Sequence, residues 1–139
     1  VKEALLFNYV TDRETFDEHD NEERVLAVYR RSADQARISL VKLWDEDNKN
    51  YPPAVYGAGA RANVQVIAIN PINETTAEIR IEKTLTHPKA MAQTGKFSAT
   101  VAWDFNPSAQ KQMKYVWENP RGFTVTSYRV NAETMSQGG

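Results

Sequence analysis

The chain has 139 residues, and its 17 basic and 18 acidic side chains leave a formal net charge of -1, so no overall field favours nucleic acid or an anionic membrane. It has no cysteine, which excludes disulfides, thiolate metal sites and cysteine nucleophiles. Its length and 41% hydrophobic content are those of one globular domain, which we expect over residues 1–135, with residues 136–139 as a disordered tail.

The first third of the chain has the apolar period of helices. A short apolar stripe runs along residues 4–10 and continues to Phe16. Asp20 and Glu23 have the spacing of a capping box and predict the start of a second helix. The side chains expected to face inward from that helix are Val25, Leu26, Val28 and Tyr29.

Ser32 and Gln35 have the same capping spacing and predict a third helix. The residues expected on its apolar face are Ile38, Val41 and Trp44. Residues 3–46 are therefore expected to be mainly helical. The Pro52-Pro53 pair ends this pattern, because proline is not accepted inside a helix.

From residue 61 the apolar period changes to two, which is typical of strands. Four strands are expected, over residues 62–69, 77–86, 95–105 and 122–130. The short turn between the first two predicts an antiparallel hairpin. Helices followed by strands indicate an α+β fold, with three N-terminal helices packed against a curved four-stranded antiparallel sheet over residues 61–131.

No set of side chains has the spacing of an enzyme or metal site. His19 lies in an acidic stretch and His87 at a strand end, and neither has a second ligand at metal-binding spacing. Glu78 and Glu82 alternate with apolar residues, so we expect them on a solvated face beside Arg80. We predict no catalytic residue, no metal site and no cofactor.

Basic and aromatic side chains are interleaved toward the C-terminus. They are Lys111, Lys114, Tyr115, Trp117, Arg121, Phe123 and Arg129. Such interleaving occurs in nucleic-acid sites, but Glu118 interrupts it and the net charge does not support it. Because Tyr, Trp and Arg anchor protein interfaces, we expect a protein-contact surface here and no nucleic-acid binding by the domain.

Asn119, Pro120, Arg121, Gly122 and Phe123 precede the last predicted strand and predict a rigid turn. Pro120 suits position i+1 of a β-turn and holds Asn119 extended. Gly122 takes positive φ at low cost, so the turn orients Phe123 and starts the strand in register. The turn is either a connector or a preorganised contact surface that loses little entropy on binding, and we favour the contact surface.

Two motifs together point to a family. Residues 9–17, YVTDRETFD, have an aromatic residue, then Arg13-Glu14, then a second aromatic residue, and residues 119–123, NPRGF, lead into the strand TVTSYRV. This combination resembles the first-helix signature and the Asn-Pro-x-Gly motif of the VirB-eight family, over residues 9–133. Members of that family often carry leucine where this chain has Arg121, which leaves the turn intact but changes its contacts.

The resemblance implies an inner-membrane assembly factor of a bacterial type IV secretion system, in a family that includes the TraE- and TrbF-like conjugation proteins. It implies a single membrane span before residue 1, a periplasmic domain with the NTF2-like cone fold, and no catalysis. It also implies self-association and contacts with other channel subunits. The absence of a methionine at Val1 fits a domain separated from its anchor.

The main alternative is a small enzyme or ligand-binding protein that uses the cone as a pocket. An assembly module is expected to fill the cone with apolar side chains such as Phe97, Val101 and Trp103. An enzyme would place an Asp or His there with a perturbed pKa. We predict the non-enzymatic assembly module.

We also expect weak self-association through the first helix. Tyr9, Arg13 and Phe16 recur at roughly helical spacing, and aromatic and arginine side chains suit interfaces. The alternative is that Tyr9 and Phe16 pack under the sheet while Arg13 pairs with Asp17 one turn on. A membrane anchor would raise the local concentration of the domain, so a weak contact would suffice.

Overall fold

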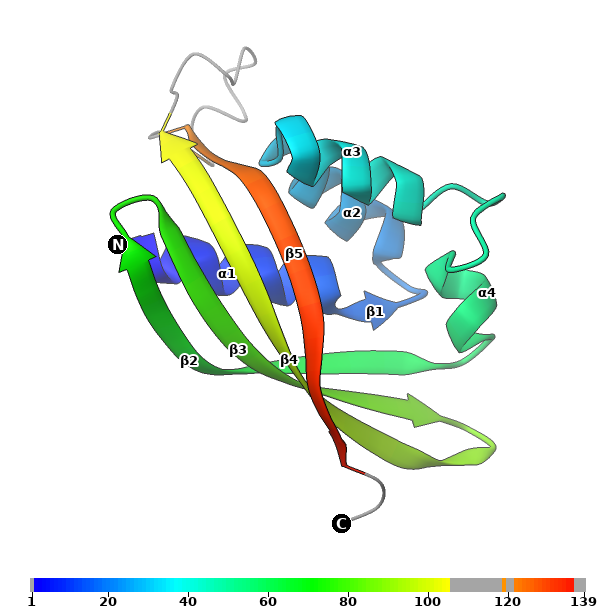
Figure 1. Cartoon of the computed structure of the whole chain (residues 1–139). Helices are drawn as coiled ribbons and strands as arrows, with labels where there is room; N and C mark the ends of the chain where they lie inside the picture. Colours follow the sequence, from blue (N-terminus) through cyan, green and yellow to red (C-terminus); the bar gives the residue numbers. More distant parts are fainter. Residues whose placement is uncertain (1, 106–118, 120–121, 137–139) are drawn as a thin grey trace.

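The computed structural model describes residues 2–105, 119 and 122–136, and in it helices lie against one face of a curved sheet (Figure 1). The helices are α1 (Lys2–Glu14), α2 (Asn21–Arg30), α3 (Asp34–Leu43) and α4 (Pro52–Tyr56). The strands are β1 (Phe16–Asp17), β2 (Arg61–Asn73), β3 (Thr76–His87), β4 (Ala90–Phe105) and β5 (Phe123–Ser136). The predicted α+β fold is confirmed, with five strands in the described sheet and not four.

The strands lie in space in their chain order, and every neighbouring pair is antiparallel. Register shifts interrupt the β2–β3 ladder between Val66 and Ala68, and the β4–β5 ladder between Ala102 and Trp103. Bulges of this kind bend a strand and increase its twist. They allow the long strands to curl around the helices.

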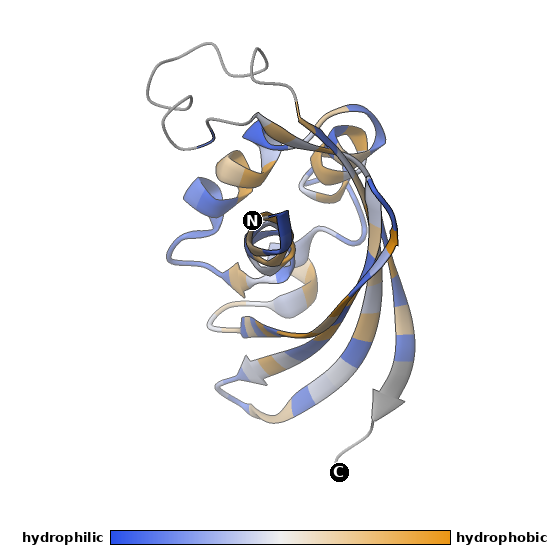
Figure 2. Cartoon of the chain, turned by 90° about the vertical axis from the view of Figure 1, so that its left-hand side faces the viewer, coloured by the Kyte–Doolittle hydropathy of each residue, from blue (hydrophilic) through white to orange (hydrophobic). Residues whose placement is uncertain are grey.

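The core lies between the concave face of the sheet and the helices (Figure 2). On β3, Ile79 and Ile81 are fully buried, and on β4 Val101 is fully buried and Trp103 is 4% exposed. Phe97 packs against this cluster and is partly buried. Each fully buried aliphatic side chain contributes about 1.5–3 kcal/mol to folding. The cone is therefore filled by apolar side chains, including the three that were expected there.

The link between α2 and α3 pairs with the outer edge of β5. Val125 donates its N–H to the carbonyl of Arg31 at 2.7 Å and accepts the N–H of Ala33 at 2.8 Å. The side-chain oxygen of Gln35 accepts the N–H of Tyr128 at 2.8 Å. These bonds satisfy groups that an edge strand would otherwise expose, and they connect the helical layer to the sheet.

The two predicted capping boxes are wrong. Asp20 and Ala33 are the N-cap residues of α2 and α3, and neither makes a side-chain capping bond. The carboxylate of Asp20 pairs with Arg24. Ser32 bonds inside the core and Gln35 bonds β5, because these distant partners replace the local ones that the spacing suggested.

α2 and α3 bury narrower faces than predicted. Val28 on α2 and Ala36 and Leu40 on α3 are buried. Four side chains of the predicted apolar faces are 38–58% exposed, namely Leu26, Tyr29, Ile38 and Val41. The small side chain of Ala36 and the buried Leu40 face the core, and this orientation leaves Ile38 and Val41 on the outer side of α3.

Two short elements, α4 and β1, were not predicted. α4 begins at Pro52, where proline is accepted because first-turn N–H groups have no helical partner. β1 has only two residues, which is too short for a visible period of two, and α1 ends at Glu14 before it. Ser136, expected to begin a disordered tail, is the last residue of β5, and residues 137–139 lie outside the described ranges.

Candidate functional site

The side of α1 that faces the core carries a chain of hydrogen bonds around Tyr9. Tyr9 is fully buried, and its hydroxyl lies 2.7 Å from the Oγ of Ser32. The Ser32 hydroxyl donates to the carbonyl of Val28 at 2.6 Å, so its hydrogen is already used and Tyr9 donates to Ser32. Nη1 of Arg13 donates to the Tyr9 oxygen at 2.8 Å. Every hydroxyl in this chain is therefore satisfied.

Arg13 also joins α1 to α3 and to the sheet. Its Nη1 donates to the carbonyl of Ala36 at 3.0 Å, and its Nη2 donates to the Oγ of Ser39 at 2.9 Å. Its guanidinium carbon lies 4.1 Å from the centre of the Tyr128 ring. A planar, always charged group suits this combination of hydrogen bonding and stacking, which a lysine cannot reproduce.

Glu14 connects α1 to two strands. The hydroxyl of Tyr128 donates to Oε2 of Glu14 at 2.7 Å, and Nζ of Lys83 donates to Oε1 at 3.2 Å. The side chains of Lys83 and Glu14 are only 17% and 16% exposed. A pair this buried needs further hydrogen bonds to offset desolvation, and Tyr128 provides one.

The pKa values of Lys83 and Tyr128 are both shifted by burial and by the Glu14 carboxylate. Burial lowers the pKa of Lys83, but the Glu14 carboxylate and Tyr56 raise it, and the net pKa lies above the ordinary value. Burial first, and then the Glu14 carboxylate, raises the pKa of Tyr128 well above its ordinary value. Lys83 is therefore charged and Tyr128 neutral at neutral pH. A lysine that acts as a base or nucleophile needs its neutral form, and the raised pKa of Lys83 disfavours that form.

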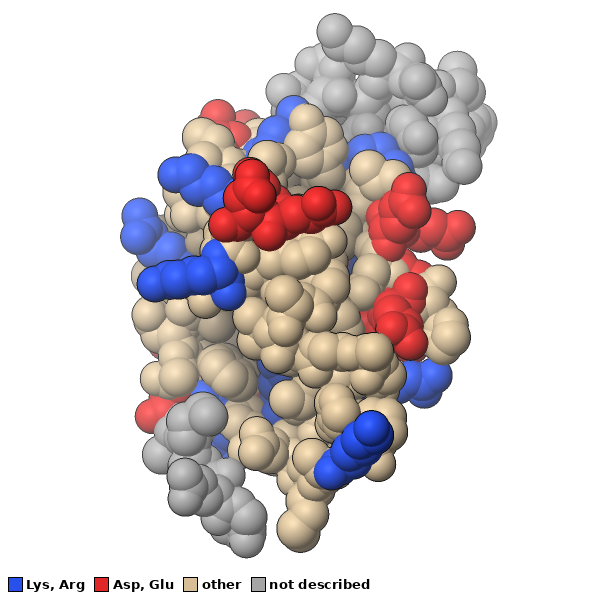
Figure 3. Space-filling model, turned by 90° about the vertical axis from the view of Figure 1, so that its right-hand side faces the viewer, with Lys and Arg blue, Asp and Glu red and all other residues tan. Residues whose placement is uncertain are grey.

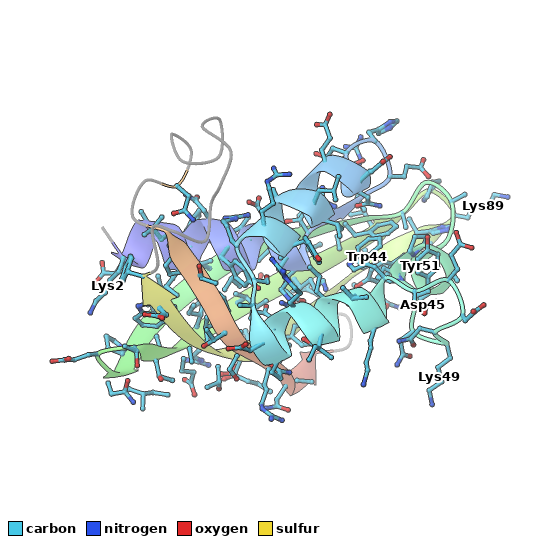
Figure 4. The ribbon with its side chains drawn as sticks, turned by 90° about the horizontal axis from the view of Figure 1, so that it is seen from above. Lys2, Trp44, Asp45, Lys49, Tyr51 and Lys89 are labelled. Carbon is cyan, nitrogen blue, oxygen red and sulfur yellow. The ribbon has the colours of Figure 1, made fainter. Side chains whose placement is uncertain are left out.

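A cavity of about 110 Å³ lies beside this cluster, between α1, α4 and β3. Its lining includes Glu14, Lys83 and the aromatic rings of Phe16, Trp44 and Tyr56. The Phe16 ring centre lies 4.8 Å from that of Tyr56 and 6.4 Å from that of Trp44. Sites for drug-sized ligands usually have about 300–1,000 Å³, so this cavity takes only a small group. Figure 4 places Trp44 and Tyr51 at the end of the molecule opposite Lys2.

The histidines do not contribute to the cavity or to a metal site. His19 is exposed, and Nδ1 of His87 accepts the N–H of Lys89 at 3.1 Å in the β3–β4 turn. Within residues 2–105, 119 and 122–136, no group of three or more His, Cys, Asp or Glu side chains could hold a metal ion.

Asn119 and Gly122, just before β5, are joined by a backbone hydrogen bond. Gly122 donates its N–H to the carbonyl of Asn119 at 2.9 Å, and Gly122 has a φ of 64°. The side chain of Asn119 accepts the N–H of Phe123 at 3.0 Å and donates to its carbonyl at 2.9 Å. One carboxamide thus binds both backbone groups of Phe123, as a neighbouring strand would. Phe123 is fully buried, with its ring centre 5.9 Å from that of Phe105.

Much of the proposed contact surface lies inside the domain or outside the described residues. Asn119 is 9% exposed and Phe123 is buried, so neither side chain presents a surface. Pro120 and Arg121 lie outside the described residues, as do the basic and aromatic residues of 106–118.

The candidate self-association residues require a correction. Tyr9 is fully buried and Phe16 is 3% exposed, and Arg13 is half-buried in the contacts given above. Asp17 lies 3.6 Å from Arg61 and not in a pair with Arg13. These side chains do not form an exposed stripe, because Tyr9 and Arg13 on α1 face the sheet and α3, and Phe16 on β1 packs against Trp44 and Tyr56.

Two members of the cluster, Lys83 and Tyr128, were missed by sequence reasoning. Lys83 continues the inward alternation of Ile79 and Ile81, and a lysine at an inward position indicates a buried carboxylate partner. Tyr128 gave no comparable signal, because the register shift opposite Trp103 changes the alternation along β5.

The model of the VirB8 protein family matches residues 1–133. The chain belongs to the VirB8 family. It is 29% identical over 139 residues to the protein virB8 of Agrobacterium tumefaciens (strain 15955). That match covers all of this chain and 60% of the relative's length. It is 28% identical over 135 residues, 96% of this chain and 57% of the relative, to the type IV secretion system protein PtlE of Bordetella pertussis (strain Tohama I).

The structural comparison agrees with this assignment. The structure of Agrobacterium tumefaciens VirB8 matches with a TM-score of 0.88 and 27% identity, and the match covers 97% of this chain and 92% of that one. VirB8 proteins are inner-membrane-associated components of type IV secretion systems, and the family is one of structural and assembly components and not of enzymes. The family resemblance and the non-enzymatic prediction are therefore confirmed.

The chain spans about 60% of the length of the VirB8 relative from Agrobacterium. None of the helices in the described ranges has both the length and the apolarity needed to cross a membrane.

Proposed function

We propose that this VirB8 domain is a non-enzymatic assembly module at the periplasmic face of the bacterial inner membrane. It acts in a type IV secretion channel through self-association and contacts with other channel subunits. The observation that carries this proposal is the packed interior of the cone. Apolar side chains form its core, and the carboxylate of Glu14 accepts hydrogen bonds from both Lys83 and Tyr128.

The ligand-binding or enzymatic alternative is supported less well by the cavity. Its volume of about 110 Å³ is small, and its charged pair, Glu14 and Lys83, is already engaged. A reaction would have to break this pair before either group could act on a substrate.

The double replacement Glu14→Gln with Lys83→Met distinguishes the assembly role from an enzymatic or ligand-binding role of the charged pair. The assembly proposal predicts that substrate transfer by the secretion system persists in cells carrying the full-length variant, provided that its fold and amount are unchanged. Circular dichroism of the purified domain and immunoblotting of the cells check that condition. Loss of transfer in a folded variant at normal abundance would favour a chemical role for the pair.

The self-association surface needs an exposed side of α1. Phe7 is a large apolar residue of α1 that is 46% exposed, unlike Tyr9 and Phe16. We propose that a weak contact includes Phe7, and that the membrane-bound state raises the effective concentration enough for it to form.

Sedimentation equilibrium of the domain over a wide concentration range tests this contact. We expect reversible association of the wild type that weakens in Phe7→Glu. Ile72→Glu is the matched control, since Ile72 is 60% exposed but lies on β2. A wild type that stays monomeric at about millimolar concentration would contradict self-association, and equal association of both variants would move the contact away from Phe7.

A further inference from the structure

The end of the molecule that holds α4 carries an exposed, uncharged surface. It consists of residues 53–59, which include most of α4 and the loop after it, and of residues 88–92 at the tip of the β3–β4 hairpin. Lys89 is the only charged residue in these two segments. Val55 is 57% exposed and Met91 is 88% exposed. We call these two segments the distal surface.

The two segments of the distal surface lie against each other. A Cβ placed on Gly59 would lie 2.9 Å from Cγ of Pro88, and one placed on Gly57 would lie 3.7 Å from Nε2 of His87. Glycine therefore allows the loop after α4 to approach the hairpin tip closely. Figure 3 looks onto this end and shows a broad tan face with acidic groups above it and to its right, basic groups to its left and one basic group projecting from its lower part.

This composition is that of an interface. Exposed apolar patches with polar rims mark sites of protein interaction, and the centres of interfaces are depleted in charge. Methionine is common on such surfaces because its flexible side chain adapts to a partner. The loop between α3 and α4 contributes a mainly acidic rim, since Asp45, Glu46 and Asp47 are exposed, together with one basic residue, Lys49.

The position of the distal surface restricts its partner. Figure 4 shows Lys2, at the start of α1, at one end of the molecule and Lys89, Lys49 and Asp45 at the other. α1 has 13 residues and is thus about 20 Å long. If the membrane-bound part precedes residue 1, as the proposed function requires, the distal surface faces away from the bilayer and toward other periplasmic proteins.

We propose that the distal surface binds another subunit of the secretion channel. The partner presents apolar side chains to Val55 and Met91, and Lys or Arg side chains to the acidic rim at Asp45, Glu46 and Asp47. A second copy of this chain fits less well, because its own α3–α4 loop is acidic overall, with only Lys49 beside three acidic residues, and its distal surface adds only Lys89. The inference rests on the proposed function and adds to it a place and a partner chemistry.

Site-specific photo-cross-linking in cells tests the proposal. The photoreactive residue p-benzoylphenylalanine replaces Met91 or Val55 in the full-length, membrane-bound protein, and adducts are identified by mass spectrometry. Ile72 is the matched control, because it is also an exposed apolar residue near a hairpin turn but lies on β2. Ile38 on α3 supplies a further exposed position.

We expect adducts with another channel subunit from positions 91 and 55, at severalfold higher yield than from position 72. The triple replacement Asp45→Lys, Glu46→Lys and Asp47→Lys should lower this yield severalfold, with the protein at unchanged abundance. Adducts made only with a second copy of the chain would overturn the proposal.

The remaining outcomes separate this inference from the proposed function. Adducts with a channel subunit from position 38 or 72, but not from positions 91 and 55, would overturn the proposal that the distal surface binds a subunit. They would still support the assembly role. Absence of adducts with any channel subunit from all four positions would contradict the assembly role as well.

Discussion

Ser32 and Asn119 each make two buried hydrogen bonds with one side chain. Ser32 accepts from the buried Tyr9 hydroxyl and donates to Val28, and Asn119 binds both backbone groups of Phe123. In a buried setting an unmade hydrogen bond costs more than a made one contributes. The two residues therefore give predictions in which chemically similar replacements have unequal effects.

Ser32→Ala should destabilise the domain more than Tyr9→Phe. Without Ser32, the Tyr9 hydroxyl hydrogen has no acceptor, which costs about 1–3 kcal/mol. Without the Tyr9 hydroxyl, Ser32 still bonds Val28 and Arg13 still bonds Ala36, so the cost is about 1 kcal/mol. Urea unfolding of both variants and of the double variant measures these costs. The double variant should lose less than the sum, and strict additivity would argue against the coupled chain.

Asn119→Asp should destabilise the turn at least as much as Asn119→Ala. Asp keeps the acceptor for the Phe123 N–H but loses the donor, and its carboxylate then faces the Phe123 carbonyl in a buried site. We expect a loss of about 1–3 kcal/mol in each case. Urea unfolding gives the loss, and hydrogen exchange at the Phe123 amide localises it. An Asp variant as stable as the wild type would show that the donated bond contributes nothing.

Among the elements, the loop between α4 and β2 depends on two glycines in different ways. Gly57 and Gly59 have φ values of 84° and 80°, which other residues adopt at a cost of about 1–2 kcal/mol. Only at Gly59 does the backbone of the loop also come too close to the β3–β4 turn for a Cβ. The two positions therefore separate conformational strain from a packing clash.

Gly59→Ala should cost more stability than Gly57→Ala. Both replacements carry the strain of positive φ, but the Cβ at residue 59 would lie 2.9 Å from Cγ of Pro88, whereas that at residue 57 meets only an ordinary contact at 3.7 Å. Thermal unfolding of the two variants gives the comparison. Pro88→Ala removes the clashing ring atoms and should restore part of the stability of Gly59→Ala. Equal losses at the two glycines would remove the packing argument.

At the scale of the whole molecule, α1 holds the helical layer and the sheet together through charge. Arg13 binds α3, and Glu14 binds Tyr128 of β5 and Lys83 of β3. The folded-state pKa values of Lys83 and Tyr128 both lie above their ordinary values of 10.5 and 10.0. A raised pKa means that the folded state holds the proton more tightly than the unfolded state.

Stability should therefore fall as the pH rises above about 10, because the unfolded chain releases these protons first. The contribution of both groups is fully present below their unfolded pKa values and is lost as the pH rises through the folded ones. Urea midpoints measured from neutral pH upward should fall more steeply for the wild type than for Tyr128→Phe. Tyr29→Phe, a change at a 38% exposed tyrosine, controls for the loss of a hydroxyl. Parallel curves for wild type and Tyr128→Phe would contradict the assignment.

The sequence by itself determined the features that depend on near neighbours. The alternation of Ile79 and Ile81 predicted a strand with one buried face, and the order of helices and strands predicted the α+β class. The positive φ of Gly122 agrees with the preference of glycine for that conformation, which depends on the residue itself. The motifs in residues 9–17 and 119–123 also pointed to the VirB8 family, because each is a short run of neighbouring residues.

Only the tertiary structure decided which side chains are partners. Ser32 and Gln35 have capping spacing, yet one bonds Tyr9 and the other bonds β5. Tyr9 and Phe16 have the composition of an interface, yet both are buried, Tyr9 against Tyr128 of β5 and Phe16 against Trp44 and Tyr56. A helix pattern gives the spacing of apolar residues but not which neighbour covers them, and a polar side chain in the core takes whichever partner the packed layers bring within hydrogen-bond distance.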